Sequence, residues 1–198
     1  MNGTGYRPPV PLAGRVVDLE PLGWEHVPEL ALAGADPSIW TFLRIGPGRD
    51  ETEMGALVAS MLEGQSRGEV LPYAVRRRAD REVVGMFRYF HIDRENQNVE
   101  LGTWLAPKVW RTAVNTDVKL TALRHAFETE GSHRVALKTD TRNERSRRAI
   151  ERLGAQFDGV LRDHVVMPDG SRRSSAVYSI LIDEWPSVRR RLETGPAP

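Results

Sequence analysis

The stretch NVELGTWLAPKVWRTAVNTDVKLTALRHAFE, residues 98–128, decides the fold of this chain. Its first part, 98–105, is a short run rich in β-forming residues, and its last part, 118–128, has the spacing of a helix. A strand that feeds a helix through a short loop often binds an anion, because the helix N-terminus offers free N–H groups and the positive end of the macrodipole. The connecting loop, 108–117, contains no glycine. It is either an unusual phosphate seat or only a turn.

The rest of the chain alternates between helical and strand-like patterns. Helices are predicted over 24–33, 51–65, 143–153 and 183–193, with a loop at 45–50. Strands are predicted around 16–19, over 72–78, 82–92 and 98–106 as an antiparallel meander, over 133–140, and over 157–167 and 172–182 as a hairpin around an Asp-Gly turn. This order predicts an α/β fold with one mixed sheet flanked by helices. We expect one domain over 1–198, with an extended lead-in at 1–14 and a tail at 194–198.

Composition narrows the function classes. The chain has 198 residues, a formal net charge of +1 and no cysteine. Disulfides, thiolate metal sites and a cysteine nucleophile are therefore excluded, and a nucleic-acid partner is not expected. No apolar run reaches the length of a membrane span and no signal peptide pattern is present, so we expect a cytoplasmic protein without a membrane partner. The five histidines show no metal-ligand spacing, and we expect no metal site.

The loop 108–117 has two interpretations. Lys108 and Arg111 place two cations beside the start of a helix that Thr112 or Asn115 can cap. The functional interpretation is a diphosphate seat made of backbone amides and cationic side chains. The simpler one is a basic surface turn with a capping residue, and the loop alone favours it.

Glu100 is the first candidate catalytic residue. Because side chains alternate along a strand, Glu100 lies on the face of Gly102 and Trp104, opposite Leu101 and Thr103. A carboxylate in such surroundings can serve as a desolvated general base. It can equally lie on a solvated face or pair with an arginine, and strand position alone favours this second interpretation.

The segment RNERSRRAIERLG, 142–154, holds the second candidate. Ser146 shares a helical face with Ile150 and Leu153, so it points toward the core side and can donate a hydrogen bond to a ligand. Asn143 can cap the helix or reach the same ligand. The arginines are interpreted as a solvated face, with i,i+4 pairs that join Glu144 to Arg148 and Arg147 to Glu151. A C-terminal left-handed cap is expected at Gly154.

Taken together, these stretches resemble the GNAT N-acetyltransferase superfamily, and within it the RimJ/RimL-like acetyltransferases. The resemblance is carried by VELGTWLAPKVWRTAVNTDVKLTALRHAFE, HRVALKTDTRNERSRRAIERLGA and DGVLRDHVVMPDGSRRSSAVYSILIDEW. It implies a mixed, mostly antiparallel central sheet with a splayed strand pair. It implies direct transfer of an acyl group from acetyl-CoA, or another short acyl-CoA, to a protein N-terminus, a lysine or a small-molecule amine. A homodimer is compatible with the family.

The resemblance also implies roles for individual residues. Glu100 would be the general base, and Ser146 would protonate or hydrogen-bond the leaving thiolate. A backbone N–H near Trp104 or Leu105 would bind the oxyanion, and Tyr178 would be structural. Cofactor contacts would come from the pantetheine strand, the pyrophosphate loop, the helix amides and the second helix: Thr103, Trp104, Leu105, Lys108, Arg111, Thr112, Ala113, Val114, Asn115, Thr116, Asn143 and Ser146.

Arg111 departs from the family pattern, which has glycine at this position. If the backbone there has a positive φ, arginine costs about 1 kcal/mol or more. If φ is negative, little is lost and a guanidinium is gained near phosphate. Two alternatives follow from the open questions. One is a non-catalytic acyl-CoA-binding or interaction protein on the same fold. The other is an acyltransferase that uses succinyl-CoA, with Arg44, Arg88 and Arg162 as candidate ligands of the extra carboxylate.

Overall fold

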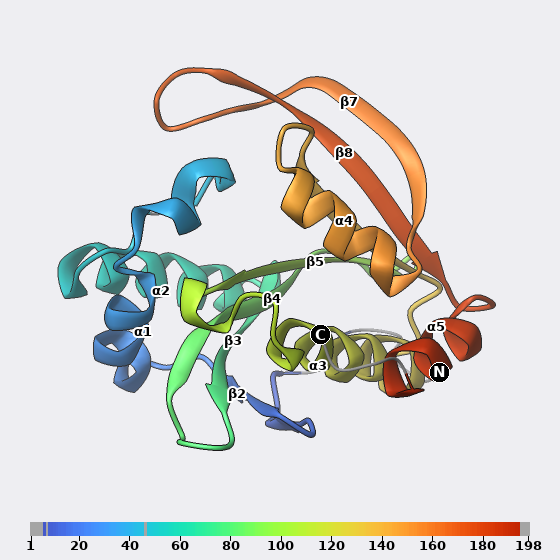
Figure 1. Ribbon diagram of the computed structural model, residues 1–198, viewed down its shortest axis with the longest axis horizontal. Helices are drawn as coiled ribbons and strands as arrows, with labels where there is room; N and C mark the ends of the chain where they lie inside the picture. The colour runs from blue at the N-terminus through green and yellow to red at the C-terminus, as the bar shows by residue number, and fades with distance from the viewer. Residues whose placement is uncertain (1–5, 7, 46, 195–198) are drawn as a thin grey trace.

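The computed structural model describes residue 6, residues 8–45 and residues 47–194, and its centre is one eight-stranded sheet with helices on both faces (Figure 1). The strand order is β1-β2-β3-β4-β5-β6-β8-β7. Neighbouring strands are antiparallel except for β5 and β6, which are parallel. The predicted mixed, mostly antiparallel sheet is confirmed.

The elements follow one another in a simple order. The strands are β1 (Leu12–Ala13), β2 (Val17–Pro21), β3 (Val70–Arg77), β4 (Val83–Asp93), β5 (Asn98–Leu105), β6 (Arg134–Asp140), β7 (Gln156–Val166) and β8 (Arg172–Leu181). The α-helices are α1 (Val27–Gly34), α2 (Glu51–Ser66), α3 (Ala113–Arg124), α4 (Glu144–Leu153) and α5 (Trp185–Thr194). Short 3-10 turns are η1 (Trp24–His26), η2 (Pro37–Phe42) and η3 (Pro107–Val109), and η4 (His125–Thr129) continues α3 as a π-helix.

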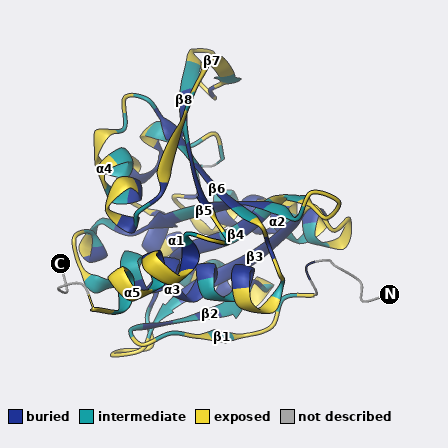
Figure 2. Ribbon diagram, turned by 90° about the vertical axis from the view of Figure 1, so that its right-hand side faces the viewer, coloured by how far each residue is buried: buried dark blue, intermediate teal, exposed yellow. Residues whose placement is uncertain are grey.

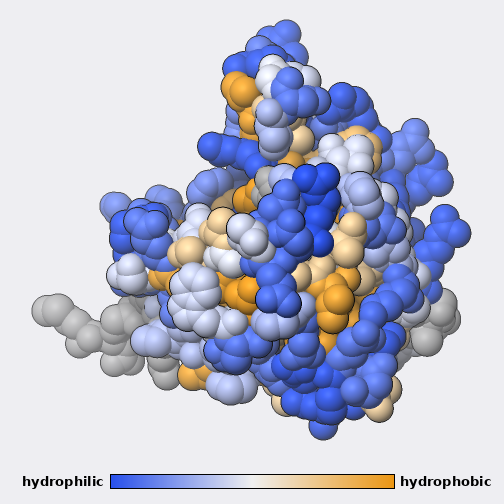
Figure 3. Space-filling model, turned by 90° about the vertical axis from the view of Figure 1, so that its left-hand side faces the viewer, coloured by the Kyte–Doolittle hydropathy of each residue, from blue (hydrophilic) through white to orange (hydrophobic). Residues whose placement is uncertain are grey.

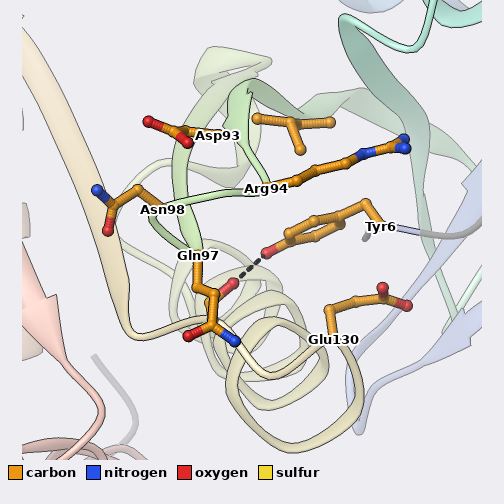
Figure 4. A pocket seen from close by; sticks show the side chains of 8 residues that line it. Tyr6, Asp93, Arg94, Gln97, Asn98 and Glu130 are labelled. Carbon is orange, nitrogen blue, oxygen red and sulfur yellow. Dashed lines mark hydrogen bonds between the residues drawn. The ribbon is translucent and has the colours of Figure 1, made fainter. Parts of the chain in front are cut away.

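The described parts of the predicted lead-in and tail contain regular structure. Within the predicted lead-in, β1 pairs with β2, and the Tyr6 hydroxyl lies 2.9 Å from Ser132 Oγ (Figure 4). Tyr6 is buried because its ring packs on Tyr89, with the ring centroids 5.0 Å apart. Thr194 is the last residue of α5, while residues 1–5, 7 and 195–198 of the predicted lead-in and tail lie outside the described residues.

Two further differences have local causes. The η2 turn was not predicted, and it begins where the Asp36 carboxylate accepts a hydrogen bond from the Ser38 N–H at 2.9 Å, with Pro37 at the first position. The predicted helix over 24–33 is divided into η1 and α1. By contrast, Gly154 ends α4 with φ +100°, as the sequence pattern predicted.

The sheet separates two hydrophobic cores. On one face, strand residues such as Phe87 and Leu101 pack with α3, α4 and α5, and on the other, Met86 and Trp104 pack with α1 and α2. The tip of the β7–β8 hairpin rises away from both cores, and β7 is largely exposed, whereas Tyr178 and Ile180 of β8 pack in the first core (Figure 2). In Figure 1 the hairpin arches over α4, with its tip toward the segment that joins α1 to α2. Helices therefore cover both faces of the sheet near its centre, and the hairpin edge is left largely exposed.

The parallel strand pair separates halfway along its length. β5 pairs with β6 from Asn98↔Arg134 to Leu101↔Leu137. Beyond that point β5 continues along β4 as far as Leu105, whereas β6 continues along β8 as far as Asp140. The predicted splayed strand pair is thus present, and it leaves the last residues of β5 with a free edge.

Candidate functional site

Beyond Leu101, the backbone groups on one edge of β5 face the gap that opens between β5 and β6, and this gap is called the splay. The Ala106 N–H donates to the Val84 carbonyl at 2.8 Å, and a Cβ placed at Gly85 would lie 2.2 Å from the Trp104 carbonyl oxygen, so both Trp104 and Ala106 turn their backbone toward β4. Backbone groups alternate along a strand, so Thr103 and Leu105 turn theirs toward the splay. The Leu105 carbonyl accepts a bond from Trp110 Nε1 at 2.8 Å. The other groups can pair with an extended ligand.

The N-terminus of α3 lies just beyond this edge. Thr112, and not Asn115, is the N-cap: its Oγ1 accepts from the Val114 N–H at 3.3 Å and donates to the Val109 carbonyl at 2.7 Å. Helix geometry leaves the Ala113 and Asn115 amides without intrahelical acceptors. Thr116 lies one residue further along, where intrahelical bonding begins. The start of α3 can therefore offer two free amides and the positive end of the helix dipole to an anion.

Arg111 adopts the backbone conformation of the glycine that it replaces. Its φ is +61°, in the left-handed region. The loop is therefore folded as a glycine-containing loop would be, at a conformational cost of about 1 kcal/mol. What the chain gains is an exposed guanidinium at the start of α3.

Arg145 of α4 adds a second guanidinium from the other side of the splay. Its Cζ lies 3.4 Å from the centroid of the Trp110 ring, a cation–π contact. Burial and then the nearby charge of Arg111 lower the Arg145 pKa. Arg145 is exposed, as the interpretation of a solvated face predicted, but its guanidinium also packs on Trp110 and so lies against the loop. The signal that could have identified it is a tryptophan beside an arginine in the loop, since a large ring at such a position needs a partner to pack on.

The side chain of Lys108 is already paired with a carboxylate in the structure. Its Nζ forms an ion pair with the Glu82 carboxylate at the start of the β4 hairpin. Both side chains are about half exposed, so an anionic ligand can exchange with Glu82 at little cost. Its predicted role as a phosphate ligand stays a prediction.

Glu100 is buried on the face of the sheet that α1 and α2 partly cover. One carboxylate oxygen, Oε2, lies 2.6 Å from Lys138 Nζ and 3.1 Å from His91 Nδ1. The sequence suggested an arginine as the alternative partner, but the cation that pairs with Glu100 is a lysine on β6, across the splay. Oε1 has no hydrogen-bond partner among the described residues. Glu100 therefore keeps one oxygen for a proton at the point where the strands separate.

The predicted residues of α4 lie on the opposite side of the sheet. The Asn143 side chain caps α4 by accepting from the Ser146 N–H at 3.1 Å. The Ser146 hydroxyl is partly buried and bonds to no other described residue. The structure brings Glu100 and Ser146 to opposite faces of the splay and shows no direct contact between them.

Tyr178, which was predicted to be structural, joins β8 to α4. Its hydroxyl donates to Glu151 Oε1 at 2.9 Å and accepts from Arg147 Nε at 3.1 Å. It therefore links the two residues that the sequence paired directly at i,i+4, and it ties β8 to α4. The other predicted pair, Glu144 with Arg148, is present at 2.7 Å.

A cavity of about 440 Å³ lies between the η2 segment and the tip of the hairpin. Figure 3 looks onto this side of the molecule, where pale and apolar side chains lie among hydrophilic ones. Apolar walls with a few polar groups are typical of sites for small molecules. The lining includes Trp40, Phe42, Leu43, Ile45, Arg49, Arg142, Met167 and Asp169.

Other candidates for a ligand site are weaker. Tyr89 is buried in the opposite core, where its hydroxyl donates to the Ala122 carbonyl at 2.8 Å. The hollow beside Tyr6 in Figure 4 has only about 10 Å³, room for about one water molecule. Within residues 6, 8–45 and 47–194, no group of three or more acidic or histidine side chains could hold a metal ion. Over the same residues, no helix is both long and apolar enough to span a membrane.

Comparison with known proteins identifies the family. A family model described as an acetyltransferase (GNAT) domain matches residues 17–156. A candidate acetyltransferase from T. thermophilus is 37% identical, with a TM-score of 0.85 over 95% of this chain and 97% of that one. A GCN5-related N-acetyltransferase from Brucella melitensis is 28% identical, with a TM-score of 0.89 over 100% of this chain and 90% of that one.

Curated relatives match over a shorter stretch. The candidate ribosomal N-acetyltransferase YdaF of Bacillus subtilis is 30% identical over 106 residues, 54% of this chain and 57% of YdaF. The chain spans 61% and 57% of the lengths of the first two curated relatives that it matches. The family resemblance seen in the sequence is thereby confirmed.

Proposed function

The chain belongs to the GNAT acetyltransferase family, and on this premise we propose that it transfers an acyl group from acetyl-CoA, or another short acyl-CoA, to an amine. The observation that carries the proposal is the position of Glu100. It is a buried carboxylate with one oxygen unpaired among the described residues, at the point where β5 separates from β6 and exposes an unpaired backbone edge. A base next to an extended binding edge is what direct transfer to an amine requires.

The residues around the splay fit an acyl-CoA. The backbone of Thr103 and Leu105 would pair with the pantetheine arm. The amides of Ala113 and Asn115, with Arg111 and Arg145 on either side, would hold the diphosphate. A bound acyl-CoA supplies the activated thioester. The predicted contact of Lys108 requires that it first leave Glu82.

The chain's own groups then divide the chemistry between them. Glu100 Oε1 would accept the proton of the attacking amine, directly or through a water. Of the two backbone N–H groups considered for the oxyanion, Leu105 is favoured, because Trp104 turns its backbone toward β4. Ser146 would donate a hydrogen bond to the leaving sulfur. The acceptor would approach from the face of Glu100, next to the cavity between η2 and the hairpin.

The acceptor class is a primary amine, as a protein N-terminus, a lysine or a small molecule. YdaF, a relative with 30% identity, carries a name that refers to the ribosome. A ribosomal-protein N-terminus is therefore one acceptor to include in a screen.

The proposal is tested by binding and turnover measured separately. Calorimetric titration with acetyl-CoA, succinyl-CoA and CoA should show micromolar binding, and an amine screen should then show release of CoA thiol. Glu100→Gln should leave CoA binding intact and lower kcat at neutral pH about 100-fold or more, the usual range for loss of a general base.

Glu95→Gln, an acid in the exposed turn between β4 and β5, serves as the matched control. Unchanged turnover in Glu100→Gln would remove Glu100 from the mechanism. Tight CoA binding without transfer to any amine would instead support a non-catalytic binding protein.

A further inference from the structure

Several cationic side chains gather around Glu100 on one face of the sheet. Glu100 pairs in register with Phe90 of β4 and Ala136 of β6. Arg88 and Lys138 lie two residues along those strands and so share its face. Arg173 on β8 lies on the same face, two residues beyond Ser175, which pairs with Asp140.

Arg88 is partly buried and forms no ion pair with a carboxylate of the described residues. Its Nη1 lies 3.4 Å from Met61 Sδ, and its Cζ lies 4.6 Å from the centroid of the Phe90 ring. Gly102 makes room for it, since a Cβ there would lie 3.1 Å from Arg88 Nε. A sulfur atom and a ring face are weak partners for a guanidinium.

Arg173 is held in a similar incomplete way. Its Nη1 donates to the Phe42 carbonyl at 2.9 Å, which brings it to the wall of the cavity. Its Nε is buried and has no hydrogen-bond partner in the part of the chain that the structure describes. Elsewhere the chain matches such arginines carefully: Arg76 reaches Glu20 at 2.8 Å and Glu29 at 2.9 Å.

The charge of Glu100 does not balance this group. Its carboxylate already contacts Lys138 and His91. Burial lowers the pKa of both Arg88 and Arg173. The charge of Glu100 partly counters this effect in Arg88, and the charges of Asp140 and then Glu100 partly counter it in Arg173, although Asp140 itself is paired with Arg142. Burial of a charged group without a partner is costly, and a ligand anion would remove that cost.

We propose that a carboxylate of the substrate binds between Arg88 and Arg173, beside Glu100. The inference rests on the proposed acyl transfer and narrows its substrate class. The carboxylate belongs either to the acyl group, as in a dicarboxylic acyl-CoA, or to the acceptor, as in an amino acid. In both cases planar guanidinium groups bind the acid through charge-assisted hydrogen bonds and orient the substrate toward Glu100.

Binding to matched ligand pairs tests the inference and separates the two sources. Succinyl-CoA and acetyl-CoA form the acyl pair. With CoA present, glycine and glycinamide, and β-alanine and β-alaninamide, form the acceptor pairs. We expect the acid member of one class to bind at least about tenfold more tightly in calorimetry, the scale of one charge-assisted contact. The class that shows the preference identifies where the carboxylate lies.

Variants establish which residues cause the preference. Arg88→Gln and Arg173→Gln should each reduce it about tenfold, and Arg88→Lys, which keeps the charge, should retain part of it. The affinity for free CoA should stay unchanged and shows that the variants fold. Arg67→Gln, at the C-cap of α2, is the matched control, because its partners Glu63 and Glu69 lie on the surface, and it should change nothing.

Equal affinity within every pair, or a preference that survives both glutamine variants, overturns the inference. Its failure is distinct from failure of the proposed function. Acyl transfer without any preference for an acid refutes the carboxylate site alone. A preference in binding that the glutamine variants abolish, without transfer to any amine, refutes only the enzyme.

Discussion

Arg111 combines an unfavourable backbone conformation with a charge near the start of α3. A positive φ of +61° in a non-glycine residue is unfavourable, yet it places a guanidinium beside the start of α3 and opposite Arg145. The strain is local and small, whereas a phosphate contact is worth more in a partly desolvated seat. The replacement is therefore consistent with a working anion site.

Substitution of Arg111 should separate these two effects. Arg111→Gly should stabilise the fold by about 1 kcal/mol and weaken CoA binding about tenfold, because the strain and the cation leave together. Arg111→Ala should weaken CoA binding equally without the gain in stability, since alanine keeps the strain. Denaturant unfolding and calorimetry measure the two quantities. CoA affinity that does not change in either variant would place Arg111 outside the seat.

Prediction at the scale of single residues succeeded where the pattern was local. The alternation along 98–105 correctly placed Glu100 opposite Leu101. Contacts between distant segments were missed: Lys138 on Glu100 depends on the register of β5 and β6, and Arg145 on Trp110 depends on how α4 packs. The spacing of residues within one segment cannot predict either contact.

At the scale of elements, α3 organises the fold as well as the candidate site. Asp117 accepts backbone N–H groups of Arg15, Val16 and Val17, at 3.2, 2.7 and 3.0 Å. One carboxylate of the helix thus fixes the start of β2, and the close packing leaves no room for a Cβ at Gly14, which would lie 2.4 Å from Asp117 Oδ2. The position of α3, whose N-terminus faces the splay, is therefore fixed by the contact of Asp117 with the start of β2.

Loss of this contact should be costly. Asp117→Ala should lower the free energy of unfolding by roughly 2–4 kcal/mol, because it leaves buried N–H groups unpaired. Urea denaturation measures the change, with Asp158→Ala, which removes a partly exposed carboxylate from β7, as the control. A loss below about 1 kcal/mol would mean that water replaces the carboxylate without difficulty.

Element types were largely predictable because caps and periodicity agree with the final fold. Thr112 before α3 and Asn143 before α4 were predicted as capping residues and cap these helices in the structure, and Asp50, which was predicted only as part of a loop, caps α2. The η2 turn was missed because it has no hydrophobic period. The role of β1 was missed because two residues, Leu12 and Ala13, are too few to form a pattern.

At the scale of the whole molecule, two cores share one sheet, and a buried cation adds to the cost of folding. Lys119 of α3 is buried, donates to Thr103 Oγ1 at 2.6 Å and forms no ion pair with any described residue. Burial lowers the Lys119 pKa to about 8, from a usual value of 10.5. The unfolded chain therefore binds more protons than the folded one between these values, and the contribution of Lys119 to stability rises with pH.

A comparison with Lys119→Met should reveal this contribution. The free energy of unfolding of the natural chain, relative to the variant, should rise by roughly 2 kcal/mol between pH 7.5 and 10. The buried tyrosines act in the opposite direction above pH 10, but they are common to both proteins and cancel. Parallel stability curves in guanidinium denaturation would show that Lys119 keeps its ordinary pKa.

The order of elements predicted the mixed sheet. It did not predict that the hairpin would be largely exposed, or the residue at which β5 and β6 separate. Hydrophobic pattern reports which residues are buried, whereas the direction in which β6 and the hairpin leave β5 depends on packing across the whole sheet. The family resemblance supplied the splay as an expectation, and the register of β5 and β6 gives it a position after Leu101.

That splay has a thermodynamic consequence. Pairing between β5 and β6 stops in the middle of the sheet. A ligand that lies along the free edge of β5 would pair with the backbone groups that are left unpaired there. Such a ligand binds the folded chain and not the unfolded one, so its concentration adds directly to stability, by about 2.7 kcal/mol at 100 times its dissociation constant. With the acyl-CoA proposed above as that ligand, the stability of this protein would rise with the acyl-CoA concentration.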